Sequence, residues 1–147
     1  MFDFFWKKSV RESRPPIQFF NTASGQLEVF KSLTPSEVTM YSCGPTVYDH
    51  IHVGNLRSYL LPDLIKRLLL LNEYEVKHTI NFTDFGHLSD DGDAGEDKMM
   101  KAIKRHELPM NKSSMAKVAD IYIRSFKLDN DRFGNLPPTN YTKASDY

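Results

Sequence analysis

The sequence predicts an α/β fold built on a parallel sheet, and three consecutive segments carry this prediction. Residues 38–42 form a β-prone run, residues 55–71 place apolar side chains at helical spacing, and residues 74–82 form a second β-prone run. A strand, a helix and a strand in succession make a βαβ unit, in which the strands are parallel and the crossover is right-handed. We therefore expect one such unit in the middle of the chain.

The residues before this unit predict a small antiparallel hairpin. Residues 1–16 end in a pair of prolines and are expected to form a flexible lead-in. Residues 17–20 and 27–30 are short β-prone runs, and the turn-forming residues between them include Asn21 and Gly25.

The helix expected over residues 55–71 has an apolar stripe. Its apolar positions are Leu56, Tyr59, Leu60, Leu64, Ile65, Leu68 and Leu71. Charged residues are expected to take the other face, namely Arg57, Asp63, Lys66 and Arg67. Pro62 is discordant, because a proline inside a helix removes one hydrogen bond and favours a kink.

Two further helices are expected in the second half of the chain. An acidic, glycine-rich loop precedes a helix at about residues 96–105. A second helix is expected at about residues 111–126, with Asn111 as its N-cap. Residues 128–147 are polar and predict a connecting segment with no closing strand.

Composition bounds the class of protein. The chain has 147 residues, about the length of one domain. Lys plus Arg and Asp plus Glu both number 19, so the zero net charge gives no overall attraction to nucleic acid. A single cysteine excludes an internal disulfide framework and fits a reducing compartment. No signal-peptide pattern is present and the longest aliphatic run, Leu68 to Leu71, is too short to cross a bilayer, so a cytoplasmic protein is expected.

The stretch over residues 41–55 combines residue types that suit a site better than a core. It contains the only cysteine, Cys43, and also Gly44, His52 and Gly54. It follows a predicted parallel strand and leads into a helix N-terminus, where backbone N–H groups and the helix dipole favour phosphate. Gly54 would let a ligand approach the backbone, and His52 could donate a hydrogen bond to it. On these residues alone, a glycine turn with a surface histidine is an equally good interpretation.

Other polar residues have simpler structural interpretations. A lone cysteine is more often a small buried hydrophobe than a ligand. Four more histidines have no clear chemical partner in the sequence: His50, His78, His87 and His106. His87 has the best claim to function among these because it flanks the expected pocket. The acidic residues of segment 89–97 lack EF-hand spacing, so a solvated loop is expected there.

Specific motifs add a family resemblance. The motif CGPTVYD at residues 43–49, followed by HVGN at residues 52–55, resembles the signature of the cysteinyl-tRNA synthetases, which are class I aminoacyl-tRNA synthetases. The segment NFTD at residues 81–84 resembles the asparagine-x-threonine-aspartate segment of the same family. The resemblance covers about residues 17–127 and implies the N-terminal half of a Rossmann-like nucleotide-binding domain.

The resemblance assigns four residues to the amino-acid side of a site. Cys43 would be one ligand of a zinc ion whose open position takes the thiolate of a substrate cysteine. Zinc prefers sulfur to a hydroxyl oxygen, so such a site would distinguish cysteine from serine. Gly44, Thr46 and Thr83 would line the amino-acid pocket.

Three residues are assigned to ATP. His52, Gly54 and Asn55 stand in a variant of the family's HIGH motif and would bind the phosphates. His52 and Asn55 would also be catalytic, because they would stabilise the transition state of adenylation. Asparagine at the last position still donates a hydrogen bond, although it cannot carry a charge.

The resemblance implies an enzyme that activates cysteine with Mg-ATP and transfers it to tRNA(Cys), as a monomer that does not bind membranes. The other zinc ligands of the family and its KMSKS loop have no counterpart in the sequence, where residues 112–117 match only its composition. A truncated chain that is inactive alone is therefore expected. Two alternatives stay open: a fragment of a mycothiol-type cysteine ligase, and a nucleotide-binding module without catalytic activity.

Overall fold

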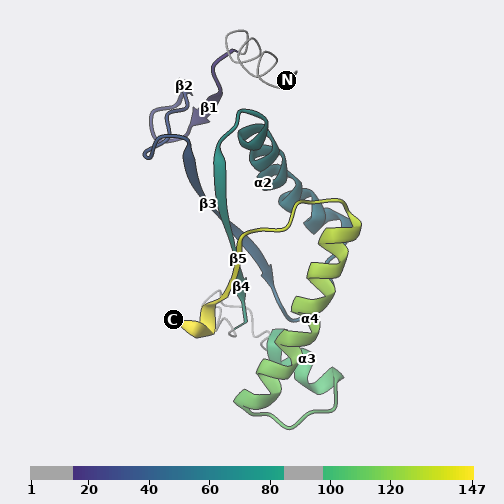
Figure 1. Cartoon of the computed structure of the whole chain (residues 1–147). Coiled ribbons are helices and arrows are strands. Elements are labelled where there is room, and N and C mark those ends of the chain that lie inside the picture. Colours follow the sequence, from purple (N-terminus) through teal and green to yellow (C-terminus); the bar gives the residue numbers. More distant parts are fainter. Residues whose placement is uncertain (1–14, 85–97) are drawn as a thin grey trace, which may run out of the picture. The chain divides into compact units, whose positions relative to one another are not determined.

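The structure is a computed structural model that describes residues 15–84 and 98–147 (Figure 1). The chain forms two compact units, Met1–Pro35 and Ser36–Tyr147. Most of the lead-in expected over residues 1–16 lies outside the described residues, as do His87 and the acidic segment 89–97.

The first unit contains the expected antiparallel hairpin. Strand β1 (Gln18–Asn21) pairs with strand β2 (Gln26–Val29). Gly25 in the turn has a φ of 69°, a left-handed conformation that favours glycine. The rings of Phe19 and Phe30 meet edge to face with centroids 5.6 Å apart. The hairpin prediction is confirmed.

The second unit is built on a three-stranded parallel sheet in the order β3-β4-β5 (Figure 1). Its elements in chain order are β3 (Glu37–Thr46), α2 (Val53–Leu71), β4 (Glu75–Thr83), α3 (Lys98–Arg105), α4 (Lys112–Arg132), β5 (Asn140–Lys143) and the 3-10 turn η1 (Ala144–Asp146). β3 and β4 are parallel and joined through α2, so the predicted βαβ unit and the α/β fold class are confirmed.

The helix predictions are confirmed in type and position. α2 continues through Pro62 to its end at Leu71. α4 begins after Asn111, whose side-chain oxygen accepts a hydrogen bond from the Ser114 N–H at 2.9 Å, as expected of an N-cap. α4 runs on to Arg132, beyond the end expected from the sequence.

The expected absence of a strand after residue 128 is wrong. Asn140–Lys143 forms β5, which pairs in parallel with β4. The Thr139 N–H donates to the His78 carbonyl at 2.7 Å, and the Tyr141 ring stacks on Phe82 with centroids 5.3 Å apart. The segment is short and mostly polar, so these contacts with β4, more than its own pattern, determine that it is a strand.

Helices α2 and α4 cover the same face of the sheet. The ring of Phe126 on α4 meets Tyr59 of α2 at 4.9 Å and Phe82 of β4 at 5.4 Å, both edge to face. Two right-handed crossovers that advance in the same direction along a sheet place their helices on one face. No described helix covers the opposite face, where Tyr41 of β3 is 65% exposed.

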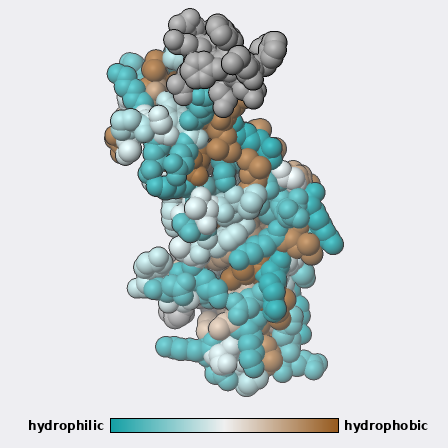
Figure 2. All heavy atoms as spheres, in the orientation of Figure 1, coloured by the Kyte–Doolittle hydropathy of each residue, from teal (hydrophilic) through white to brown (hydrophobic). Residues whose placement is uncertain are grey.

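The expected orientation of α2 is wrong at two charged positions. Asp63 and Lys66 are buried, with 6% and 8% exposure, whereas Leu64 is 53% exposed, and Figure 2 shows hydrophobic side chains at the surface of this helix. The backbone that leads from α4 to β5 lies against the charged side of α2. Asp63 accepts a hydrogen bond from the Leu136 N–H at 2.7 Å, and Lys66 donates to the Pro137 carbonyl at 2.6 Å. Because each buried charge has a polar partner, burial is tolerated.

Candidate functional site

The carboxyl ends of β3 and β4 meet at one edge of the sheet. In the register, Cys43 lies beside Asn81 and Thr46 lies beside Thr83, with an irregularity between the two pairs. A Cβ added at Gly44 would lie 2.2 Å from the backbone oxygen of Asn81, so only glycine allows the strands to approach here. β3 extends to Thr46, beyond the end expected from the sequence, and carries the CGPT motif on the strand itself.

The side chains predicted to bind an amino acid are brought together at this edge. Cys43 and Thr46 are exposed, and Thr83 is half-buried beside Thr46. The Val47 N–H donates to the Thr83 carbonyl at 3.1 Å and holds the two strand ends together. Asn81, next to Cys43, has a buried side-chain oxygen with no hydrogen-bond partner among the described residues.

His52 and Asn55 form a reciprocal cap at the start of α2. His52 Nδ1 accepts a hydrogen bond from the Gly54 N–H at 3.1 Å, and Asn55 Oδ1 accepts one from the His52 N–H at 3.1 Å. Because Nδ1 accepts, the hydrogen of the neutral imidazole lies on Nε2. The cap therefore leaves two donors unused, the N–H of His52 at Nε2 and the amide NH₂ of Asn55.

The position of the His52 ring explains why residue 54 is a glycine, which the sequence alone did not reveal. A Cβ at this position would lie 2.9 Å from Cε1 and 3.0 Å from Nδ1 of the His52 ring. The glycine thus gives the imidazole room to fold back over the helix start. The H-x-G-N spacing is explained by this cap as well as by any need for a ligand to approach the backbone.

The electrostatics of the helix start favour an anion. The first turn of α2 contains no acidic residue, so no carboxylate of the helix itself neutralises the positive end of its dipole. His52, Gly54 and Asn55 are all exposed. Exposed donors at an uncompensated helix N-terminus can bind phosphate oxygens.

Tyr59 of α2 lies near the exposed thiol of Cys43. Burial, with a smaller contribution from Cys43, raises the pKa of Tyr59 to about 12. The Tyr59 phenol therefore stays neutral at physiological pH, so it brings no negative charge to this part of the site.

The described residues do not make a zinc site. Among residues 15–84 and 98–147, no group of three or more His, Cys, Asp or Glu side chains is arranged to hold a metal ion. A catalytic zinc needs about three protein ligands, and Cys43 is a free, exposed cysteine that by itself would be one.

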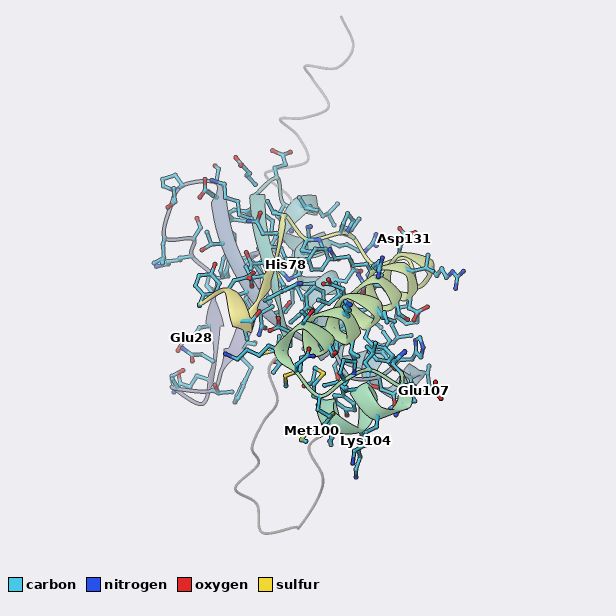
Figure 3. The ribbon with its side chains drawn as sticks, turned by 90° about the horizontal axis from the view of Figure 1, so that it is seen from below. Glu28, His78, Met100, Lys104, Glu107 and Asp131 are labelled. Carbon is cyan, nitrogen blue, oxygen red and sulfur yellow. The ribbon has the colours of Figure 1, made fainter. Side chains whose placement is uncertain are left out.

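His78 lies away from this edge, between the sheet and the helices (Figure 3). Its Nε2 is 2.8 Å from Ser42 Oγ, whereas its Nδ1 is buried with no hydrogen-bond partner among the described residues. Burial and then the nearby Lys66 lower the pKa of His78, while Asp63 acts in the opposite direction. His78 thus has a structural partner that the sequence could not identify.

Asp84 and Tyr122 contribute to this region, although the sequence did not single out a role for either. Asp84 accepts hydrogen bonds from the N–H of Ser145 at 2.9 Å and from its hydroxyl at 2.5 Å, so it ties the end of β4 to η1. Tyr122 of α4 contacts His50 and His106. In both cases the contacts join residues that are far apart in the chain. A single sequence gives no indication of such contacts.

No helix within the described residues is both long enough and apolar enough to span a membrane.

Comparisons with known proteins agree with this architecture. The family described as tRNA synthetases class I (C) catalytic domain matches residues 29–147. The chain is 41% identical over 132 residues to cysteine–tRNA ligase 1 of Burkholderia lata, a match that covers 90% of this chain and 27% of that protein. It is 39% identical over 132 residues to cysteine–tRNA ligase of Zymomonas mobilis, covering 90% and 25%. It is 42% identical over 123 residues to cysteine–tRNA ligase of Chlorobium luteolum, covering 84% and 24%.

The chain spans about a quarter of the length of these curated relatives. The family match covers most of the chain, including both strand ends and the capped start of α2. The chain therefore belongs to the cysteinyl-tRNA synthetases, as an N-terminal part of their class I catalytic domain.

Proposed function

We propose that these residues form the part of a cysteine–tRNA ligase that binds ATP and receives cysteine for activation. The observation that carries the proposal is the reciprocal cap at the start of α2. It occupies one face of His52 and Asn55 and leaves a donor on each for a phosphate. The proposed reaction joins cysteine to the α-phosphate of Mg-ATP with release of pyrophosphate, and the aminoacyl group then passes to tRNA(Cys).

The chemistry expected of the helix start is positioning and charge stabilisation. His52 Nε2–H and the Asn55 amide would donate hydrogen bonds to phosphate oxygens, and the helix dipole would favour the negative charge that develops there. His52 is held by its own cap, so the donor is in place before the nucleotide binds.

The amino-acid side of the proposed site is the edge formed by Cys43, Thr46 and Thr83. Gly44 contributes mainly by letting β3 approach β4, which sets the spacing of these side chains. Zinc binding through Cys43 remains a prediction that needs ligands from outside the described residues. Magnesium would enter with ATP.

Assignment of residues 17–127 to half of the nucleotide-binding domain also remains a prediction.

A calorimetric titration of Mg-ATP into the 147-residue chain tests the nucleotide part of the proposal. His52→Asn is the decisive variant, because asparagine keeps an N-cap acceptor but cannot reach a ligand as histidine Nε2 does. Lys112→Gln, an exposed position at the start of α4, is the control. We expect saturable binding that His52→Asn weakens at least about tenfold, the loss of one hydrogen bond to a charged group. Equal affinity in wild type and His52→Asn would contradict the proposal.

A second assay addresses the activity of the chain by itself. We predict no cysteine-dependent exchange of pyrophosphate into ATP by the 147-residue chain. Exchange above that of a Cys43→Ala control would overturn this prediction of inactivity.

The first alternative makes a different prediction in the same titration, and the second differs in the acceptor of the activated cysteine. A binding module would take Mg-ATP with no dependence on cysteine or zinc. A mycothiol-type cysteine ligase would transfer activated cysteine to an amino sugar. The names of the three relatives above support transfer to tRNA.

A further inference from the structure

The five residues between β3 and His52 are held by α3 and α4. Val47 belongs to the hydrophobic core of this unit, and Tyr48 and Ile51 pack against it. The Lys98 ammonium lies 5.3 Å from the centre of the Tyr48 ring. We call residues 47–51 the connecting loop. The loop therefore packs against a core to which α3 and α4, both distant in sequence, contribute.

Asp49 makes the first polar attachment of the connecting loop. Its Oδ1 accepts hydrogen bonds from Arg105 Nη1 of α3 at 3.0 Å and from the His50 N–H at 2.8 Å. The bond from Arg105 is the main reason that the pKa of Asp49 lies below its ordinary value. Both side chains are partly exposed, so the pair orients the loop more than it stabilises the fold.

His50 makes the second attachment. Its Nδ1 is 2.7 Å from Ser125 Oγ on α4, and Ser125 in turn donates to Asp129 at 3.4 Å. The contact between His50 and Ser125 is the shorter of the two, and Ser125 Oγ joins His50 to Asp129 whichever of the two groups donates at Nδ1. The His50 ring also meets the Tyr122 ring edge to face, with centroids 5.1 Å apart.

Tyr122 links the two attachments. It is 3% exposed, and its hydroxyl is 3.3 Å from Arg105 Nη1 and 3.1 Å from His106 Nε2. The same side chain therefore contacts the ion-pair partner of Asp49 and the ring of His50. Arg105, Tyr122 and Ser125 form one binding surface for the connecting loop.

We infer that Asp49 and His50 are positioning residues that set the place of His52 through α3 and α4. Two peptide units separate His50 from His52, so their Cα atoms lie at most about 7 Å apart. A fixed His50 thus limits the positions that His52 and the first turn of α2 can adopt. The effect on ATP rests on the proposed function, whereas the effect on the helix start does not.

The test uses two perturbations of the connecting loop in the 147-residue chain. The first is His50→Ala. The second is Asp49→Arg, with the charge-swapped double variant Asp49→Arg/Arg105→Asp as its rescue. Lys77→Gln is the control, because Lys77 forms an ion pair of similar length with Glu37 at 2.7 Å, near the amino end of the sheet.

Two measurements are made on each variant. One is amide hydrogen exchange of Asn55 and Leu56, whose N–H groups donate to the His52 carbonyl at 2.9 and 3.1 Å. The other is the dissociation constant for Mg-ATP. We expect exchange at these amides to accelerate about tenfold in His50→Ala, while that of core amides stays unchanged. We expect Mg-ATP to bind about tenfold more weakly in His50→Ala and about two- to fivefold more weakly in Asp49→Arg, with recovery in the charge-swapped variant.

The outcomes separate this inference from the proposed function. If wild type binds Mg-ATP and the loop variants match Lys77→Gln in affinity and exchange, the inference is wrong. A charge-swapped variant that is no better than Asp49→Arg also contradicts it, because a general loss of stability would not be rescued. If wild type does not bind Mg-ATP, the proposed function fails, and the exchange of Asn55 and Leu56 still decides whether the connecting loop positions the helix start.

Discussion

Replacing Asn55 with aspartate would separate the two roles that we give to this side chain. The cap needs only an acceptor, since Asn55 Oδ1 receives the His52 N–H at 3.1 Å. Aspartate keeps that acceptor, so the cap is retained. It also places a carboxylate in a first turn that has no acidic residue, where the helix dipole favours negative charge.

The expected effects on stability and on ATP binding have opposite signs. The free energy of unfolding should rise by about 0.3–1 kcal/mol, the usual value of one carboxylate at a helix start. The amide donor is lost and a negative charge faces the phosphates. Two charges 4 Å apart interact by about 4 kcal/mol near a protein surface, and partial solvation reduces this, so we expect binding to weaken by about 2 kcal/mol, or roughly thirtyfold.

The assay combines urea unfolding with calorimetric titration of Mg-ATP, both at one ionic strength because salt screens both effects. Asn55→Ala is the matched control: it loses the cap acceptor and the donor without adding charge, so it should lower stability as well as affinity. An Asn55→Asp variant that binds Mg-ATP as tightly as wild type would refute the assignment of Asn55 to the phosphates. Lower stability in that variant would refute the capping argument.

Three further predictions concern the fold around the site. Gly44→Ala should lower the free energy of unfolding in urea by about 2–4 kcal/mol, because the new Cβ would lie 2.2 Å from the Asn81 backbone oxygen. Gly134→Ala is the control: its Cβ would meet open space, and the φ of 83° alone should cost only about 1 kcal/mol. Equal costs for the two variants would argue against a close approach of the strands at Gly44. Asp63→Ala should lower the free energy of unfolding by about 3 kcal/mol, because Lys66 would stay buried without its neighbouring charge. Leu64→Ala should lower it by less than about 1 kcal/mol, because Leu64 is exposed. If Leu64→Ala cost more than Asp63→Ala, the buried face of α2 would be the one expected from the sequence. Burial lowers the pKa of His78 in the folded state. Below about pH 6.5 the unfolded state therefore binds a proton that the folded state does not. The free energy of unfolding should fall by up to about 1.4 kcal/mol per pH unit as the pH is lowered, until the pKa of the folded state is reached. His78→Gln should make that fall shallower, and an unchanged slope would show that other groups cause it.

The βαβ unit and the place where its motif residues converge could be predicted because their signals are local. The spacing of apolar residues in α2, the turn residues of the hairpin and the cap at Asn111 depend on neighbours within a few positions. The motif residues likewise converge because the carboxyl ends of two parallel strands must meet at one edge.

The features that were missed depend on distant parts of the chain. β5 is a strand because it pairs with β4, and Asp63 and Lys66 are buried because the backbone at Leu136 and Pro137 lies against them. The contacts of His50 with Ser125 and Tyr122 join positions more than 70 residues apart, and the periodicity of one segment carries no information about them.

Binding of a non-hydrolysable analogue of cysteinyl adenylate tests whether this edge of the sheet holds cysteine and ATP together, because this ligand spans both parts of the proposed site. Calorimetry on the 147-residue chain would compare it with Mg-ATP in wild type, His52→Asn and Thr83→Val. We expect His52→Asn to weaken the binding of both ligands and Thr83→Val to weaken only that of the adenylate analogue. An analogue that does not bind, or one whose affinity neither variant changes, would contradict the claim that this edge of the sheet holds cysteine and ATP together.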